Sequence, residues 1–247
     1  MAQKETSMTS PSKRVALVTG GNRGIGRAIV EALLGRGFRV WFCGRTPDSV
    51  RAAENSVLGG GAAVVQGRVC DVRDFKQVSA LVAEIEKTDG RLDVLVNNAG
   101  LGHFAPVDEM DPDRFREVVE VNLLGPFHGV RAAAALMKRG GGGWIFNIAS
   151  LAAKNAFAGG SAYNASKFGL VGMSEAAMLD LRHDGIRMAA ICPGSVATEM
   201  RTTMRAEAQE WMLRPEDVAR VITDLLEFPD RALPSLIEIR PSRPPKT

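Results

Sequence analysis

The chain has 247 residues, of which 45% are hydrophobic and 24% charged, and its formal net charge at pH 7 is +3. This length suits one α/β domain, and the small, dispersed charge with only 6% aromatic residues argues against a nucleic-acid-binding surface. No apolar run approaches the roughly 18 residues of a membrane span, and residues 1–14 carry no apolar segment of a signal peptide. We therefore expect a cytoplasmic protein, with no membrane or nucleic-acid partner, whose cysteines are buried free thiols.

Short apolar runs alternate with longer amphipathic segments, which is typical of repeated strand–helix–strand units. This pattern predicts strands over residues 15–18, 38–43, 62–66, 92–96, 144–149, 187–191 and 236–239. It predicts helices over residues 25–35, 48–58, 74–87, 112–138, 161–183 and from 215 onward. We expect an α/β fold with one domain over residues 13–240, after a disordered lead-in (1–12) and before a C-terminal tail (241–247).

The first predicted strand runs into the segment Thr19-Gly20-Gly21-Asn22-Arg23-Gly24-Ile25-Gly26, and a helix follows directly. Glycines at 20, 24 and 26 would let the backbone approach a pyrophosphate, which the N–H groups at the helix start would bind. A glycine triplet alone is weak evidence, and a plain strand-to-helix turn is the alternative. The strand before it and the helix after it favour a dinucleotide-binding turn.

Tyr163 is the single tyrosine of the chain, and Lys167 follows it by four residues on a predicted helix. Residues four apart lie on the same helix face, so the ammonium would lower the phenol pKa from about 10 towards neutrality. Such a phenol could exchange a proton near physiological pH. Taken alone, the pair is more often a half-buried ring beside a solvated charge.

Several separated motifs, in order and at natural spacing over residues 13 to about 200, resemble the classical short-chain dehydrogenase/reductase family. They are T-G-x-x-x-G-x-G from Thr19 to Gly26, Asp71-Val72, Asn97-Asn98-Ala99-Gly100, the Tyr163–Lys167 pair, and Pro193-Gly194 with Thr198. The resemblance implies a doubly wound Rossmann fold, with about seven parallel strands in the order 3-2-1-4-5-6-7 and helices on both faces.

The resemblance also implies four catalytic residues, Asn122, Ser150, Tyr163 and Lys167. They would serve hydride transfer between a nicotinamide and a carbonyl or secondary alcohol carbon. Tyr163 would be the proton donor or acceptor, and Ser150 would hydrogen-bond the reacting oxygen. Lys167 would lower the phenol pKa and hold the nicotinamide ribose, and Asn122 would fix a water that links Lys167 to solvent.

The implied cofactor-binding residues come from all of these motifs: Gly20, Asn22, Arg23, Gly24, Ile25, Gly26, Arg45, Asp71, Val72, Asn98, Ala99, Gly100, Tyr163, Lys167, Pro193, Gly194, Val196 and Thr198. The second strand ends in Gly44-Arg45, without the carboxylate that binds the ribose 2′-hydroxyl in NAD enzymes. Arg45 can pair with a 2′-phosphate, and Arg23 can approach it from the other side. We expect NADP(H) rather than NAD(H); two solvated arginines are the alternative.

The expected substrate contacts are Ser150, Tyr163, His103, Asn155 and Phe157, with Leu101 and Phe104 as further loop candidates, and no metal is expected. The sequence resembles ketoacyl-carrier-protein reductases, so a small carbonyl or alcohol substrate, acyl thioesters included, is expected. The segment from Ala232 to Pro241 departs from that pattern and is closer to broader carbonyl reductases. Small residues in helices 112–138 and 161–183 favour pairing into a homodimer or homotetramer.

Two other function classes compete with an NADP(H)-dependent oxidoreductase. A non-enzymatic NADP(H)-binding sensor or scaffold on the same fold stays open, because fold alone does not determine function. The complete catalytic set favours an enzyme. A sugar epimerase or dehydratase fits less well, because the glycine spacing differs and about 50 residues after Pro193 leave no room for a larger substrate domain.

Overall fold

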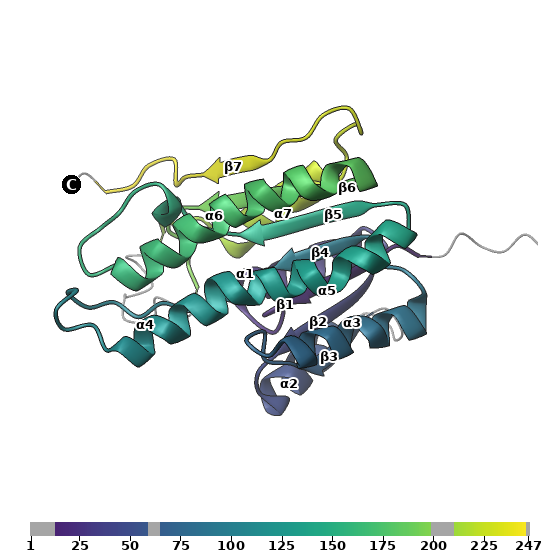
Figure 1. Cartoon of the computed structure of the whole chain (residues 1–247), viewed down its shortest axis with the longest axis horizontal. Helices are drawn as coiled ribbons and strands as arrows, with labels where there is room; N and C mark the ends of the chain where they lie inside the picture. Colours follow the sequence, from purple (N-terminus) through teal and green to yellow (C-terminus); the bar gives the residue numbers. More distant parts are fainter. Residues whose placement is uncertain (1–12, 59–64, 199–209, 246–247) are drawn as a thin grey trace, which may run out of the picture.

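A computed structural model describes residues 13–58, 65–198 and 210–245. Its centre is a parallel sheet in the order β3-β2-β1-β4-β5-β6-β7, which confirms the expected topology (Figure 1). The strands are β1 (Val15–Thr19), β2 (Arg39–Gly44), β3 (Val65–Val69), β4 (Val94–Asn97), β5 (Gly143–Ile148), β6 (Ile186–Pro193) and β7 (Leu236–Ile239). The predicted lead-in and the last two residues of the predicted tail lie outside the described residues.

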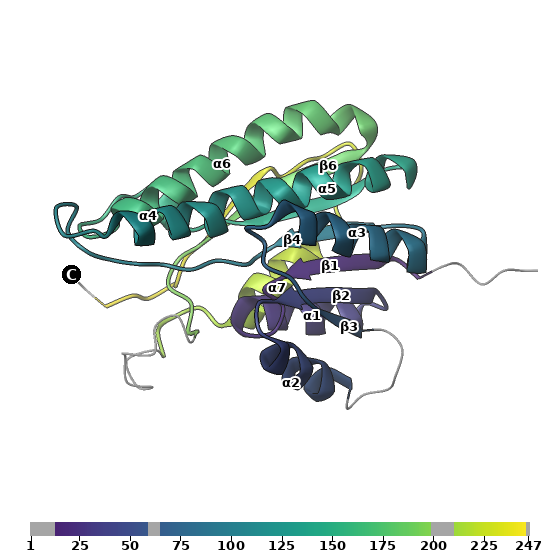
Figure 2. The ribbon, with the colours of Figure 1, turned by 60° about the horizontal axis from the view of Figure 1, so that its bottom comes forward.

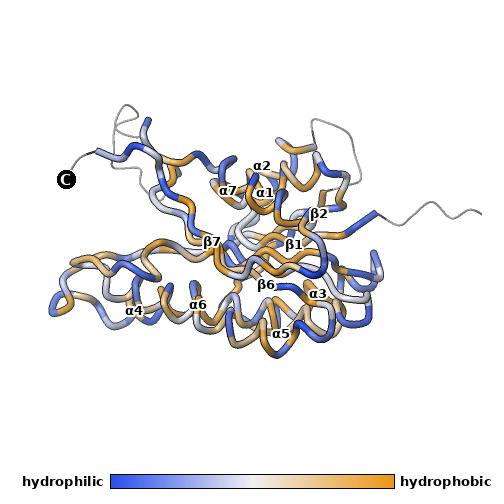
Figure 3. Tube along the Cα trace, turned by 90° about the horizontal axis from the view of Figure 1, so that it is seen from above, coloured by the Kyte–Doolittle hydropathy of each residue, from blue (hydrophilic) through white to orange (hydrophobic). Residues whose placement is uncertain are grey.

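Helices cover both faces of the sheet, as the view along it shows (Figure 3). They are α1 (Gly24–Gly35), α2 (Pro47–Leu58), α3 (Phe75–Asp89), α4 (Pro112–Val119), α5 (Gly125–Arg139), α6 (Ser161–Leu181) and α7 (Pro215–Leu225). Short turns of helix lie at η1 (Glu120–Leu124), η2 (Leu151–Ala153) and η3 (Arg182–Asp184). The layer of α1, α2 and α7 lies on one face, and α3, α5 and α6 lie on the other. No helix in the described ranges is both long and apolar enough to cross a bilayer.

Side-chain alternation along the strands builds two apolar cores. In β1, Ala16 and Val18 pack with α1 and α7, whereas Val15 and Leu17 pack with α3 and α5. All five residues of this strand are buried because helices cover both faces. Continuous apolar runs such as Val15–Val18 therefore mark central strands of this sheet.

The third strand was predicted over 62–66, but the structure has β3 at Val65–Val69, so the predicted bounds were wrong. The cause is that β3 is an edge strand with one exposed side. It carries the polar Gln66 and Arg68, and at Gly67 a Cβ would come within 2.7 Å of a Val50 methyl carbon. A search for apolar runs favours the more hydrophobic residues before it, of which 62–64 lie outside the described residues.

The long helix predicted over 112–138 is interrupted, which corrects that prediction. Between α4 and α5 the chain forms one turn of π-helix, where the Gly125 N–H reaches Glu120 O. Pro126 follows directly and lacks the N–H of a regular helix, so the hydrogen-bond ladder changes register here. Figure 2 shows that α4 and α5 still run as one bent rod beside α6.

Candidate active site

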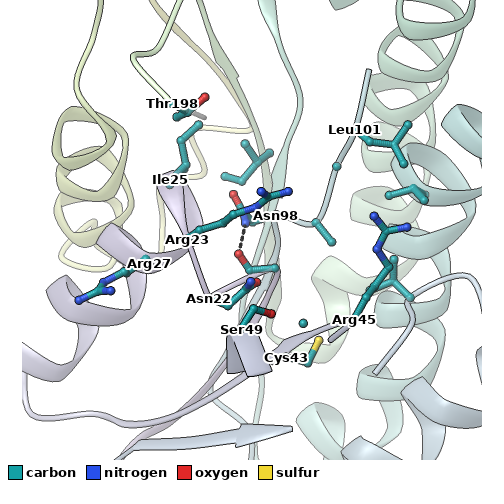
Figure 4. A pocket seen from close by; sticks show the side chains of 18 of the residues that line it. Asn22, Arg23, Ile25, Arg27, Cys43, Arg45, Ser49, Asn98, Leu101 and Thr198 are labelled. Carbon is teal, nitrogen blue, oxygen red and sulfur yellow. Dashed lines mark hydrogen bonds between the residues drawn. The ribbon is translucent and has the colours of Figure 1, made fainter. Parts of the chain in front are cut away.

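The carboxyl ends of the central strands border a cleft of about 660 Å³ (Figure 4). It is lined by most of the predicted residues: Gly20, Asn22, Arg23, Gly24, Ile25, Arg45, Val72, Asn98, Ala99, Gly100, Ser150, Tyr163, Lys167, Pro193, Val196 and Thr198. Sequence reasoning missed further lining residues: Arg27, Cys43, Gly44, Thr46, Ser49, Ala52, Ala53, Cys70, Val121, Ile148 and Ala149. Most of these flank predicted residues or lie on the first turns of α2, where strand and helix packing decide which side chains reach the cleft.

The glycine-rich turn is held by residues of the neighbouring strand end. Asn98 Nδ2 donates to Thr19 O and Gly20 O at 3.0 and 3.1 Å, and Thr19 Oγ1 accepts from Asn98 N at 3.0 Å. Gly20 and Gly24 have φ of 64° and 52°, a backbone conformation that favours glycine. A Cβ at Gly26 would fall 2.2 Å from Gly20 O, so this glycine permits the close approach of turn and helix.

The start of α1 suits an anion. The first turn of α1 holds no acidic residue, and its N-cap Arg23 makes no side-chain capping hydrogen bond. Among the described residues that line the cleft, four are cationic, namely Arg23, Arg27, Arg45 and Lys167, and none is a carboxylate. Backbone N–H groups and the helix dipole add to this positive potential. The donor set therefore fits a dinucleotide that carries several phosphates.

Arg45, directly after β2, lies near a carboxylate that does not line the cleft. Its Nη1 lies 3.6 Å from Glu117 Oε1, on α4. Nitrogen atoms of three further side chains lie close to the Glu117 carboxylate: Arg73 at 3.5 Å, Arg114 at 3.4 Å and His103 at 3.1 Å. The hydrogen bond from His103, with these neighbouring charges, lowers the pKa of Glu117. Sequence reasoning missed Glu117, because nothing in its local pattern marks it.

Three predicted cofactor residues do not line the cleft. Gly26 and Gly194 do not border the cleft, and a Cβ at either position would clash with a neighbouring residue, Gly20 or Pro241 respectively. The Asp71 carboxylate is occupied by Arg73, whose Nη2 donates to it at 2.6 Å, and this bond lowers the Asp71 pKa. Its neighbour Val72 does line the cleft.

At one end of the cleft, three predicted catalytic residues, Ser150, Tyr163 and Lys167, lie where α6 approaches the end of β5. Lys167 is almost fully buried and its Nζ donates to Ile148 O at 2.8 Å. The same Nζ lies 5.7 Å from the centroid of the Tyr163 ring. Burial lowers the pKa of Lys167 to about 8. Ser150 Oγ accepts from Ala152 N at 3.1 Å, which leaves its hydroxyl hydrogen available for a ligand oxygen.

Asn122 sits in the π-helical turn and does not line the cleft. Its Oδ1 accepts from Leu101 N at 2.9 Å, and its Nδ2 donates to Leu101 O at 2.8 Å and to Ser166 Oγ at 3.1 Å. Leu101 does line the cleft. The Asn122 side chain therefore ties the loop after β4 to α6, and the predicted water link stays a prediction.

The remaining predicted substrate residues, His103, Asn155 and Phe157, lie outside the lining of this cleft. His103 is paired with Glu117, and Asn155 Nδ2 donates to Leu151 O at 3.4 Å. The Phe157 ring contacts the ring of Phe104, which in turn contacts the ring of Tyr163.

Comparison with known proteins places this geometry in a family. The family model of short chain dehydrogenases matches residues 14–209. A Streptomyces coelicolor protein provisionally named a ketoacyl reductase is 37% identical over 220 residues, 87% of this chain and 84% of that protein. A 3α-hydroxysteroid dehydrogenase of Mediterraneibacter gnavus is 34% identical over 188 residues, 76% of this chain and 75% of that enzyme.

Solved structures agree with these sequence matches. A metagenomic short-chain oxidoreductase in complex with NADP superposes with a TM-score of 0.82 at 36% identity, covering 95% of this chain and 100% of that one. The family model, the sequence relatives and the solved structure agree, and the chain belongs to the short-chain dehydrogenase/reductase family of oxidoreductases.

Proposed function

We propose that this chain is an NADP(H)-dependent oxidoreductase that interconverts a carbonyl compound and a secondary alcohol. The proposal is supported above all by one observation: a single cleft has Tyr163, Lys167 and Ser150 at one end and a cationic, carboxylate-free glycine turn at the other. NADP in the related metagenomic structure supports the cofactor. Relatives named for ketoacyl and hydroxysteroid chemistry support the reacting group.

Each catalytic side chain has a distinct task. A bound nicotinamide supplies or accepts the hydride, which protein side chains cannot do. Tyr163 gives its proton to the carbonyl oxygen, or takes one from the hydroxyl in the reverse direction. Ser150 donates a hydrogen bond to the same oxygen and holds it beside the phenol. Lys167, held by Ile148 O, places a positive charge 5.7 Å from the ring and stabilises the phenolate.

The preference for NADP(H) rests on the end of β2 and the start of α2. Arg45 and Arg23 line this part of the cleft together with Thr46 and Ser49. Guanidinium groups bind a 2′-phosphate with charge-assisted hydrogen bonds, and the hydroxyls add further donors. We expect NADPH to have a kcat/KM at least about tenfold above that of NADH, which corresponds to one such contact. Equal efficiency with both cofactors would contradict this preference.

The acid/base role is tested with Tyr163→Phe, which keeps the ring and removes the hydroxyl. Turnover with NADPH and a panel of ketones, aldehydes and ketoacyl thioesters should fall by at least about 100-fold, the usual contribution of a positioned proton donor. NADPH affinity, measured by fluorescence titration, should fall much less than turnover, because many other residues line the cleft. Retention of most turnover would exclude Tyr163 as the proton donor. Tight NADPH binding without turnover of any panel member would favour a sensor instead.

A further inference from the structure

Two exposed phenylalanines lie next to each other just outside the cleft, and one of them contacts the ring of Tyr163. Phe104 lies in the loop after β4, and its ring centroid is 5.6 Å from that of Tyr163 in an edge-on arrangement. Phe157, between η2 and α6, lies 5.9 Å from Phe104. The two phenylalanines are 55% and 48% exposed. We refer to Phe104 and Phe157 as the aromatic shelf.

Glycines and backbone hydrogen bonds hold both rings of the shelf in place. A Cβ at Gly102 would fall 2.6 Å from Phe104 Cζ, and one at Gly160 would fall 2.6 Å from Phe157 Cε2. The two loops are joined where Ala105 N donates to Gly159 O at 3.0 Å. Each ring thus packs over a glycine of its own loop, and the hydrogen bond between the two loops holds the rings side by side.

The two loops offer little to a negatively charged substrate. Their basic residues are His103 and Lys154, and both already contact carboxylates. His103 Nε2 lies 3.1 Å from Glu117, and Lys154 Nζ lies 2.6 Å from Glu238. Exposed rings beside a catalytic group favour a ligand that covers them, because burial of aromatic surface is favourable and ring pairs add to it.

We propose that the substrate carries its carbonyl or hydroxyl group beside an uncharged ring system, which packs on the aromatic shelf while the reacting oxygen meets Tyr163 and Ser150. A rigid ring loses less conformational freedom on binding than a flexible chain of equal size, and only the ring gains the stacking contact. This inference rests on the proposed function, because it assigns the substrate class of the same site.

The test compares two uncharged ketones of equal carbon number, 4-phenyl-2-butanone and 2-decanone, with NADPH as the reductant. We expect kcat/KM to be at least about fivefold higher for the ring-bearing ketone, the ratio that about 1 kcal/mol of ring pairing produces. Phe157→Ala should raise KM for that ketone about fivefold, with kcat and NADPH affinity within about twofold of the original values. KM for 2-decanone should rise less.

Two further variants separate ring stacking from simpler effects. Phe157→Leu keeps apolar surface without a ring, so its KM for 4-phenyl-2-butanone should lie between those of the original protein and Phe157→Ala. Phe228→Ala removes an exposed phenylalanine beyond the end of α7, 42% exposed, and should change neither KM. Thermal unfolding of each variant confirms that the fold is retained.

The outcomes distinguish failure of the proposed function from failure of the substrate class. No turnover of any ketone overturns the proposed function, and this inference with it. Turnover with 2-decanone or a ketoacyl thioester at least as efficient as with the ring-bearing ketone overturns the substrate class alone. A Phe157→Ala protein with a lower melting temperature but an unchanged ring-to-chain ratio also overturns it, because the ring would then stabilise the fold without contacting the substrate.

Discussion

Lys167 is a cation buried away from water, and the proposed mechanism gives it a catalytic role. Its Nζ is held by Ile148 O, and burial rather than a neighbouring like charge lowers its pKa to about 8. A buried ammonium destabilises the fold, yet it keeps a positive charge beside the Tyr163 ring at neutral pH. Function and stability therefore conflict at this residue.

This conflict predicts a pH-dependent effect of Lys167→Met. The folded-state pKa of about 8 lies below the roughly 10.4 of an unfolded lysine, so between these values the unfolded chain binds more protons and stability rises with pH. The destabilising effect of the buried charge on the folded state is fully present below pH 8. The variant should gain about 1–2 kcal/mol in unfolding free energy at pH 7, less towards pH 10, and lose turnover. Urea unfolding at pH 7 and pH 10 measures the difference in unfolding free energy, and Lys76→Met, at an exposed lysine, is the control. A Lys167→Met protein less stable than the original at pH 7 would contradict this prediction.

Glu117 and a cofactor 2′-phosphate would compete for Arg45. The Arg45–Glu117 pair is 3.6 Å long and partly exposed, so it is weak and screened by salt. We expect Glu117→Gln to lower the NADPH dissociation constant about threefold at low salt and to leave that of NADH unchanged. Arg45→Ala should weaken NADPH binding by at least about tenfold. Fluorescence titrations at two salt concentrations measure both, and parallel changes for the two cofactors would refute the competition.

The connection between β1 and α1 depends on a glycine that has no room for a side chain. Gly26 leaves no room for a Cβ, which would lie 2.2 Å from Gly20 O and 2.4 Å from Asn98 Nδ2. Gly35 ends the same helix, and a Cβ there would meet no neighbouring heavy atom within 4 Å. The two glycines of one helix thus make a matched pair for substitution.

We expect Gly26→Ala to destabilise the protein by about 1–3 kcal/mol, the usual effect of overpacking, and to weaken NADPH binding at least about tenfold. Gly35→Ala should be neutral or stabilise by up to about 1 kcal/mol, because alanine favours helix. Thermal unfolding and NADPH titration of both variants measure the difference. Similar effects at the two positions would show that helix propensity, and not the close approach, determines the need for Gly26.

The interrupted rod of α4 and α5 shows how an element is adapted to the site. The π-helical turn at η1 places Asn122 against Leu101 and Ser166, which joins three segments of the chain. Helical periodicity over 112–138 predicts an unbroken helix, because a single extra residue hardly changes the apolar pattern. The distant partners of Asn122 make the irregular turn favourable.

At the scale of the whole molecule, exposed apolar side chains gather on the outer helices of one layer. They include Leu124 and Phe127 near the start of α5, 42% and 46% exposed, and Phe168 and Leu179 on α6, 47% and 49% exposed. These helices are the pairing surfaces expected from their small residues. We continue to propose a homodimer or homotetramer assembled through them, because such side chains are usually covered in an assembly.

Sedimentation equilibrium should therefore give a mass that is a multiple of the 26.5 kDa chain. Phe168→Glu should shift this mass towards the single chain, because a carboxylate in an apolar interface loses hydration without a partner. Phe228→Glu, which changes an exposed ring elsewhere, should leave the mass unchanged. A monomer at micromolar concentration of the original protein would exclude this assembly.

Local patterns determined much of this protein from sequence alone. Apolar periodicity located the strands and most helices, because burial on two faces requires continuous apolar runs. The glycine spacing between Thr19 and Gly26 located the glycine-rich turn that borders the cleft, since glycine tolerates the backbone angles and close contacts found there. Helical spacing predicted that Tyr163 and Lys167 share one helix face, but only the other motifs of the family gave the pair a catalytic interpretation.

Only the tertiary structure decided the partners that come from distant parts of the chain. Arg45 lies beside Glu117 of α4, and the Asn122 amide donates to Leu101 and to Ser166 of α6. The shelf beside Tyr163 likewise depends on two loops about 50 residues apart. Periodicity reports which face of an element is buried, but which side chains meet there depends on how the elements pack, and that is where the chemistry of this cleft is decided.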